Sequence, residues 1–578
     1  MTEVTLGSDK LLKEAFSVLK HQLQEYGSVI DDPTEVALKT VQEHMVHMLV
    51  GELTDPKFFL SSLDPGKGKT EAVCALLKAW KAADFQPEGS VLISLSRLDE
   101  IRSYIDRSEL DESDFAVLVN EKDHLNTRGR ADRSEALVLF TTQEMLFRRT
   151  QAGSFQQLDC YHFRGQPRPL RIWDESLLLA QPITVRLDGI KALPEPLRPI
   201  DSALAEWVDA LGRTVNEKAA GDWITVPVAL AACQAERTRA ALSPGQWENL
   251  GRLACLAGHR ALLQDCNRYG RQLVSAPRRL PADFAPAVIL DASGRVRHTY
   301  RVWQQHGDNM VRLAAAENDY SKLTVRHWNQ AANKAVLSDP AARQPILQAV
   351  AKLINESPTA EEWLVIHHKA KGQMDVPQEL KALVGYSSRV QFLHWGNHHG
   401  TNAYQAIRKV AVIGLWTYAE AAYAAHHLAA LPGLEGGSVT KEEREGMKEG
   451  EHQHHLLQAI CRANVRNSAE GVCGDCEVYM IGKLNPELLT ETFPGATIQD
   501  WQPVMRKLRG RAADVAQEIE RRFKAPETVS ISKGSLWSAV GFSSHRQLSN
   551  VLNVADFQVW MASQGLQNRH HHIVRMAA

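Results

Sequence analysis

The sequence predicts an α/β protein with two lobes, each built around a parallel β-sheet. Short apolar runs alternate with helical stretches, a pattern typical of strands that are covered by helices on both faces. This alternation occurs twice, before and after about residue 300, which favours two lobes over one large sheet. The runs expected to form strands are 57–60, 91–95, 136–140, 170–173, 287–290, 363–366, 390–393, 409–413 and 478–481.

The length of 578 residues exceeds what one hydrophobic core usually supports, so we expect several folding units. Residues 1–300 are expected to hold N-terminal helices and the first lobe, 301–500 the second lobe, and 501–578 a linker helix and a small C-terminal domain. From about 190 to 280 long helical runs replace the alternation, which predicts a helical insertion without strands of its own. The stretch 431–453 is rich in Gly, Glu and Lys and is expected to be an exposed loop.

Composition is that of an ordinary soluble protein, with 44% apolar and 23% charged residues. The 66 basic and 68 acidic residues nearly balance, so any surface for nucleic acid must be local. From residue 506 onward basic residues outnumber acidic ones by about six, which makes this end the electrostatic candidate. No long apolar run and no secretory signal is evident, so we expect a cytoplasmic protein without a membrane span.

A glycine-rich segment at 64–70, Asp-Pro-Gly-Lys-Gly-Lys-Thr, lies between a predicted strand and a predicted helix. In such a loop the backbone N–H groups and the helix N-terminus surround phosphate oxygens. Lys69 is expected to reach the β- and γ-phosphates of ATP, and Thr70 to bind Mg²⁺, although Leu63 replaces the first glycine of the usual pattern. A chance glycine-rich turn is the alternative. The expected ATP-binding residues are Pro65, Gly66, Lys67, Gly68, Lys69, Thr70 and Glu71.

Two carboxylates, Asp174 and Glu175, follow the apolar run 170–173, about a hundred residues after the phosphate loop. Phosphoryl transfer to water requires one carboxylate near the metal and another that polarises the attacking water. We therefore expect Asp174 to bind Mg²⁺ and Glu175 to act on the water.

With this pair in view, the chain resembles the superfamily 2 helicases, the DExD/H-box group, whose DExx element matches residues 174–177. The resemblance covers roughly residues 35–500. It implies two RecA-like lobes that bind ATP and Mg²⁺ between them and hold one nucleic-acid strand across their top. Further segments similar to the family's motifs follow in the same order, at 94–97, 140–146, 288–293, 363–369, 396–404 and 458–466.

The segment 458–466 resembles the motif whose arginines reach the γ-phosphate from the second lobe, a role that suits a planar, permanently charged guanidinium. Gln458 and Arg462 fit the family's spacing, whereas Cys461 replaces a glycine and Arg466 lies one residue late. Which arginine acts as the finger therefore stays open. The implied catalytic residues are Lys69, Asp174, Glu175, Gln458, Arg462 and Arg466.

The strand-end segments of both lobes are expected to contact nucleic acid, through Ser96, Arg97, Thr141, Thr142, His368, Lys369, Thr401 and Asn402. The C-terminal segment predicts helices at 535–540, 543–552 and 556–564 and a strand at 570–576, an order that resembles a winged helix-turn-helix. His545, Arg546 and Gln547, at the start of its recognition helix, are added to the nucleic-acid candidates. Docking of a partner protein is the alternative use of this domain.

The resulting hypothesis is an ATP-dependent helicase or translocase that acts on nucleic acid, with DNA favoured over RNA because the C-terminal domain is similar to a DNA reader. The alternative is an ATP-gated switch or assembly factor that unwinds nothing. A small-molecule kinase would leave the ordered segments of the second lobe unexplained. Cys473 and Cys476 are interpreted either as half of a zinc site or as two thiols without a metal.

Overall fold

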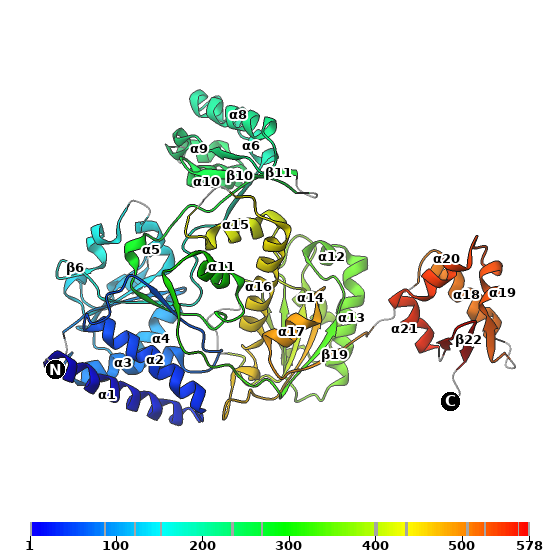
Figure 1. The fold of residues 1–578 in the computed structure, drawn as a ribbon, viewed down its shortest axis with the longest axis horizontal. Coiled ribbons are helices and arrows are strands. Elements are labelled where there is room, and N and C mark those ends of the chain that lie inside the picture. The colour runs from blue at the N-terminus through cyan, green and yellow to red at the C-terminus, as the bar shows by residue number, and fades with distance from the viewer. Residues whose placement is uncertain are drawn as a thin grey trace.

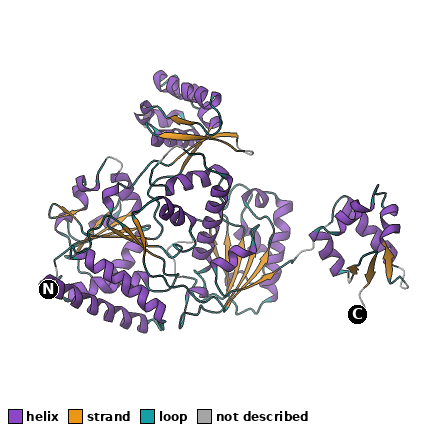
Figure 2. Ribbon diagram, in the orientation of Figure 1, coloured by secondary structure: helices purple, strands orange, loops and turns teal. Residues whose placement is uncertain are grey.

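The computed structural model describes residues 3–85, 88–120, 123–150, 153–232, 236–266, 270–397, 403–433, 437–503, 508–524, 528–564 and 566–575. Two α/β lobes lie side by side, an insertion lies above them, and a small C-terminal domain lies apart (Figures 1 and 2). The predicted α/β class is confirmed, because each lobe contains a sheet in which every strand pair is parallel. All nine predicted strands are present within two residues of the expected bounds.

The first lobe surrounds a seven-stranded sheet of order β13-β1-β12-β7-β2-β4-β3. Its strands are buried at nearly every position, as a sheet covered on both faces requires. The strands are β1 (Phe58–Ser61), β2 (Val91–Leu95), β3 (Phe115–Leu118), β4 (Val138–Thr142), β7 (Leu170–Asp174), β12 (Ala287–Leu290) and β13 (Met310–Arg312). The helices are α1 (Glu3–Glu25), α2 (Asp32–Leu49), α3 (Lys69–Ala82), α4 (Leu98–Ser108), α5 (Gln143–Thr150) and α11 (His298–His306), and β5 (His162–Phe163) pairs with β6 (Gln166–Pro167).

The N-terminal helices α1 and α2 pack against α3 and share its apolar core. Helix α2 begins where the side chain of Asp31 accepts a hydrogen bond from Thr34 N, with Pro33 in the first turn, a favourable helix start. This packing brings the connection between α1 and α2 to the end of the sheet from which α3 begins.

The second lobe surrounds a six-stranded sheet of order β16-β15-β17-β18-β14-β19. Its strands are β14 (Leu323–Trp328), β15 (Trp363–His367), β16 (Val390–His394), β17 (Lys409–Ile413), β18 (Cys476–Ile481) and β19 (Thr497–Asp500). The helices are α12 (Lys334–Ser338), α13 (Pro340–Glu356), α14 (Val376–Leu383), α15 (Glu420–Ala430), α16 (Lys441–Ile460) and α17 (Pro486–Thr492).

Helix α16 corrects the expectation of an exposed loop over 431–453. Thr440 caps the helix by accepting from Glu443 N at 3.2 Å, and the Glu443 side chain accepts from Thr440 N at 2.7 Å. The second half of α16 is buried between the two lobes. The sequence did not indicate this helix because Glu, Gln and His side chains, such as Glu451, His452 and Gln453, take up much of its buried part beside apolar ones such as Met447.

The insertion differs from the prediction in having strands as well as helices. An antiparallel sheet of order β8-β11-β10-β9 packs against the insertion's helices around an apolar core. One of the expected helical runs ends at Leu256, and the chain turns at Gly258 into two paired strands. The elements are β8 (Ile183–Arg186), α6 (Leu187–Lys191), α7 (Pro194–Leu197), α8 (Ser202–Glu217), β9 (Trp223–Thr225), α9 (Glu236–Ala241), α10 (Pro244–Leu256), β10 (Arg260–Cys266) and β11 (Gly270–Ser275).

The C-terminal domain has its own apolar core and a three-stranded antiparallel sheet of order β20-β22-β21. Its elements in chain order are α18 (Arg511–Phe523), β20 (Ser530–Ser532), α19 (Lys533–Ala539), α20 (His545–Leu552), α21 (Ala555–Ser563), β21 (Leu566–Asn568) and β22 (His572–Arg575). None of the helices in the described part of the chain has the length and apolarity needed to span a bilayer.

Candidate active site between the two lobes

The predicted phosphate loop connects β1 to the N-terminus of α3. Gly66 and Gly68 have φ angles of +89° and +90°, a left-handed conformation that side chains other than glycine rarely adopt. A Cβ atom on Gly66 would also lie 2.1 Å from the backbone oxygen of Arg466, which comes from the second lobe. The glycine there is therefore required both by the turn and by the approach of the other lobe.

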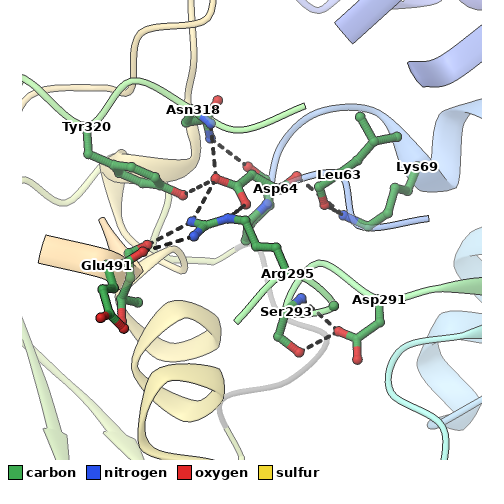
Figure 3. Close-up of polar contacts among 12 residues, drawn as sticks. Leu63, Asp64, Lys69, Asp291, Ser293, Arg295, Asn318, Tyr320 and Glu491 are labelled. Carbon is green, nitrogen blue, oxygen red and sulfur yellow. Dashed lines mark hydrogen bonds and ion pairs between the residues drawn. The ribbon is translucent and has the colours of Figure 1, made fainter. Parts of the chain in front are cut away.

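Lys69 begins α3 with its ammonium group inside the loop. It donates to the carbonyl oxygen of Leu63, and to that of Asp64 at 3.3 Å (Figure 3). Burial lowers the pKa of Lys69, and the carboxylate of Glu175 opposes this shift. A desolvated ammonium group surrounded by backbone dipoles and carboxylates is suited to exchange these partners for phosphate oxygens.

The side chains of Lys67 and Glu71 turn away from the expected phosphate position. The Lys67 ammonium is buried and donates to Thr34 Oγ1 at 2.9 Å, and to Asp31 Oδ2 at 3.4 Å. The carboxylate of Glu71 forms an ion pair with Arg107 of α4. Of these two, only Glu71 contributes to the wall of the cavity described below.

The two carboxylates after β7 occupy different surroundings in the same cavity. Tyr104 of α4 donates a 2.8 Å hydrogen bond to Asp174 Oδ2. Burial raises the pKa of Asp174 to about 6. Burial also raises the pKa of Glu175 to about 8, although the positive charge of Arg462 opposes that shift. Glu175 has a φ of +74°, a costly conformation that directs the residue out of the line of the strand.

The end of α16 and the residues that follow it complete the site from the second lobe. Gln458 Nε2 donates to Glu175 Oε2 at 3.1 Å, and Arg462 Nη2 donates to Gln458 Oε1 at 2.9 Å. Burial lowers the pKa of Arg462, and it lowers the pKa of Arg466 to about 10. The predicted catalytic residues of both lobes are thus brought together.

These residues line one cavity of about 740 Å³. Its wall also includes Tyr26, Gly27 and Ser28 from the connection between α1 and α2. The phosphate loop, α4, the end of β7 and the second lobe supply the remaining wall, through Pro65, Gly66, Gly68, Lys69, Thr70, Glu71, Glu100, Tyr104, Arg107, Asp174, Glu175, Gln405, Gln458, Arg462, Arg466 and Asn467 among others. The volume is within the range of ordinary ligand pockets.

The oxygen donors that would hold Mg²⁺, Thr70 and Asp174, both line this cavity. A hydroxyl and a carboxylate beside a site for phosphate are the donor types that Mg²⁺ prefers, so the residues present fit the ion. In the part of the chain that the structure describes, no group of three or more His, Cys, Asp or Glu side chains is placed to hold a metal. Cys473 and Cys476 are buried free thiols there.

A second set of contacts joins the lobes beside the cavity, around the segment after β12. Ser293 donates to Asp291 Oδ1 at 2.6 Å and lies 2.6 Å from Nδ1 of His454 on α16. Arg297 forms a buried ion pair with Glu451 of the same helix, with Nε 2.7 Å from Oε1. The predicted motif at 288–293 therefore lies against the second lobe.

The predicted nucleic-acid residues divide by exposure. Ser96 and Lys369 are exposed at the ends of β2 and β15, and Arg97 Nη2 donates to Asn397 Oδ1 of the second lobe at 3.0 Å. Thr141 is buried and donates to Leu118 O at 2.7 Å, which leaves it a structural contact here.

The remaining candidates also differ in their surroundings. Thr142 is half-buried at the start of α5, and its hydroxyl accepts from Met145 N at 3.2 Å. His368 is buried, and neither ring nitrogen has a hydrogen-bond partner among the described residues. Thr401 and Asn402 lie outside the described residues. In the C-terminal domain, His545, Arg546 and Gln547 are exposed at the start of α20.

Several residues in or beside the cavity were not predicted from sequence. Among them, Tyr26 and Tyr104 line its wall, and Arg295 forms an ion pair with Asp64 of the phosphate loop. Tyr104 follows the helical spacing of the buried face of α4, which by itself predicts a core residue. From the sequence alone, Asp64 is only the first residue of the phosphate loop.

Comparisons with known proteins find similar folds only at low identity. No protein-family model and no curated protein matches the chain. The structure of S. tokodaii Xpd4 is 12% identical with a TM-score of 0.43, over 80% of this chain and 99% of that chain. S. cerevisiae Dbp5 bound to RNA and ADP BeF3 is 11% identical with a TM-score of 0.34, over 87% and 98%. The DUF1998 helicase MrfA bound to DNA is 10% identical with a TM-score of 0.34, over 100% of this chain and 60% of that chain. Because these TM-scores lie below 0.5, the fold class rests on the two parallel sheets themselves.

Proposed function

We propose that this protein is an ATP-dependent motor, a helicase or translocase, that moves along nucleic acid. The observation that carries the proposal is the hydrogen bond between Gln458 and Glu175, which joins the two lobes inside one cavity. A site that needs groups from both lobes is complete only when the lobes are closed. Hydrolysis and lobe movement are then parts of one cycle.

In this cycle the phosphate loop and Lys69 hold the triphosphate, and Glu175 orients and deprotonates the attacking water. Arg462 and Arg466 stabilise the charge that spreads over the transferred phosphoryl group. Thr70 and Asp174 would hold Mg²⁺, which would supply positive charge near the β- and γ-phosphates. Gln458 holds the Glu175 carboxylate in place, since it bonds both that carboxylate and Arg462.

We assign the nucleic acid to the edge formed by the carboxyl ends of both sheets, beside Ser96, Arg97 and Lys369. The cross-lobe hydrogen bond from Arg97 to Asn397 supports this, because a strand lying there would contact both lobes. We favour DNA over RNA as the nucleic acid because the C-terminal domain resembles a DNA-binding domain. The support for this is a helix followed by β20, further helices and a β21–β22 hairpin, with β22 in the middle of the sheet, an order that resembles a winged helix.

The alternative function, an ATP-gated switch that does not unwind, is favoured by one observation. The insertion of the first lobe packs against alanines of α15 in the second lobe, and Trp223 Nε1 donates to Gly437 O at 3.1 Å. A contact that ties the lobes together away from the cavity limits their movement. Limited movement suits docking of a partner better than stepping along a strand.

The deciding experiment measures ATP turnover by the full chain alone and with single-stranded DNA, duplex DNA or RNA, followed by strand displacement on forked DNA. The motor requires stimulation by at least one nucleic acid and ATP-dependent displacement or movement. Glu175→Gln is the control, since it should bind ATP and nucleic acid and hydrolyse nothing. Turnover that ignores every nucleic acid would instead establish the switch.

The C-terminal assignment has its own test. Arg546→Ala should weaken binding to duplex DNA and reduce the slope of log affinity against log salt by about one. The matched control is Arg521→Ala, an exposed arginine on α18 that pairs with Glu518 of the same helix. Equal effects of both substitutions would mean that α20 does not face the DNA.

A further inference from the structure

The phosphate loop contains a buried carboxylate, Asp64, whose hydrogen-bond donors include residues that also contact the second lobe. Asp64 is fully buried, and Arg295 donates to both of its oxygens, from Nε at 2.8 Å and from Nη2 at 3.2 Å. Tyr320 donates its hydroxyl to Asp64 Oδ2 at 2.8 Å, and Asn318 N donates to the same oxygen at 3.0 Å (Figure 3). Four hydrogen bonds satisfy a charge that would otherwise be costly to bury.

The same guanidinium extends to the second lobe. Arg295 Nη1 donates to Glu491 O at 3.2 Å and Nη2 donates to Thr492 O at 2.8 Å, at the C-terminal end of α17. These carbonyls carry the negative end of the helix dipole, which favours a cation. Burial works against charge on Arg295, and the carboxylate of Asp64 outweighs it and raises the pKa of the guanidinium.

The segment that connects the two lobes also binds the Asp64 carboxylate. Asn318 and Tyr320 lie between β13 of the first sheet and β14 of the second. Tyr320 N donates to Pro494 O at 2.9 Å, and its ring packs edge-on against Phe493. Asp64 N in turn donates to Ala316 O at 3.1 Å. Rotation of the second lobe therefore acts directly on the donors of Asp64.

Asp64 also contacts the phosphate-binding lysine, because its carbonyl oxygen accepts from Lys69 Nζ at 3.3 Å. A continuous chain of contacts thus runs from the carbonyls of α17 through Arg295 and Asp64 to Lys69. We propose that Asp64 and Arg295 are positioning residues that set the phosphate loop for hydrolysis when the second lobe is docked. This inference rests on the proposed function, in which lobe closure and hydrolysis are coupled.

Loss of the Asp64–Arg295 ion pair should change KM and kcat differently from a loss of folding stability alone. ATP can bind the phosphate loop of the first lobe before closure, so loss of the pair should leave the KM for ATP nearly as it is. The rate of hydrolysis depends on the closed state, so kcat should fall. Loss of stability alone would instead reduce the amount of active enzyme without a selective loss of nucleic-acid stimulation.

The test uses Arg295→Lys in the full chain. A lysine keeps a positive charge beside Asp64, so the carboxylate is not left unpaired, but a single ammonium lacks the planar fork that reaches Asp64 and two carbonyls together. We expect kcat with the stimulating nucleic acid to fall at least about tenfold, while the KM for ATP changes less than about threefold.

Arg343→Lys is the matched control. The Arg343 side chain is 5% exposed, against 10% for Arg295. It pairs with Glu379 at 2.9 Å and donates to carbonyls, but all of these partners lie within the second lobe. Its substitution should lower Tm by a similar amount and leave the stimulation by nucleic acid intact. The inference is overturned if Arg295→Lys keeps the kcat of the parent chain, or if both variants lose stimulation equally.

A double substitution checks that the two residues act as one unit. Arg295→Lys added to Asp64→Asn should lower kcat little further than Asp64→Asn alone, whereas independent effects would multiply. If the parent chain is indifferent to nucleic acid, the proposed function fails. The same comparison of kcat and KM without nucleic acid then decides the inference by itself.

Discussion

The carboxyl ends of the two parallel sheets carry different chemistry. At the first sheet they present the phosphate loop and the half-buried acids Asp174 and Glu175. At the second sheet they present histidines, among them His367 and His368. The second lobe's contribution to the cavity comes instead from Gln458 near the end of α16, from residues after this helix such as Arg462, and from Gln405 before β17.

In the proposed function, this difference divides the roles of the two lobes. The first lobe would hold the groups that attract a triphosphate and polarise water, whereas the second would supply the cations that a hydrolytic transition state needs. Because neither lobe would hold all of these groups, hydrolysis in the proposed motor would depend on the approach of the lobes. Substitutions on each side should therefore fail in different ways.

The largest effect on ATP turnover is expected from a substitution in the first lobe. Lys69→Ala should abolish ATP turnover, because the β- and γ-phosphates lose their cation. Lys67→Ala provides the contrast within the same loop, since its ammonium binds Thr34 and Asp31. That variant should show a lower Tm and a turnover rate that remains measurable. A steady-state phosphate-release assay with a thermal melt checks both, and complete loss in both variants would contradict the observed direction of Lys67.

The next largest effect is expected from substitution of an arginine of the second lobe. Arg462→Ala should lower kcat by about 10³- to 10⁵-fold, as loss of an arginine finger does in other nucleotidases, with ATP still bound. Single-turnover kinetics and binding of a fluorescent ATP analogue separate the two quantities. The same measurement on Arg466→Ala shows which arginine serves as the finger. If ATP binding disappears together with turnover, the division between the two lobes is wrong.

A smaller effect concerns the mouth of the cavity. Tyr26 is 60% exposed and lines the cavity from the connection between α1 and α2, where a nucleobase can stack on its ring. Tyr26→Ala should raise the KM for ATP about three- to tenfold, the range of one aromatic contact, with kcat little changed. Tyr386→Ala, which removes a 65% exposed tyrosine from the second lobe, should leave KM as it is.

The smallest effect concerns the pH dependence of stability, which depends on titrating groups at the carboxyl ends of the two sheets. Burial raises the pKa of the acids at the first sheet, and it lowers the pKa of His368 at the second to about 4. The unfolded chain binds a proton at His368 below its ordinary pKa of 6.5 and the folded chain does not, so stability falls as pH decreases from about 6.5 to 4. His368→Gln should make the decrease in Tm between pH 7.5 and 5 smaller by about 2–4 °C. The exposed His545→Gln is the control, and an equal change there would contradict the assignment.

Local patterns predicted most of the architecture and the centre of the site. The strands could be recognised because a sheet covered on both faces needs short continuous apolar runs. The phosphate loop and the Asp174–Glu175 pair could be recognised because their chemistry is contained in a few adjacent residues. The insertion's strands and the polar helix α16 were missed, because their burial depends on neighbours distant in the chain.

By itself the sequence determined that two parallel sheets form and that one of them carries a phosphate loop followed by two acids. The tertiary structure alone decided that Lys67 turns toward α2, that Tyr104 holds Asp174 and that Arg295 holds Asp64. The physical reason is distance along the chain. Asp64 and Arg295 are 231 residues apart, and Glu175 and Gln458 are 283 apart, so only folding makes them neighbours.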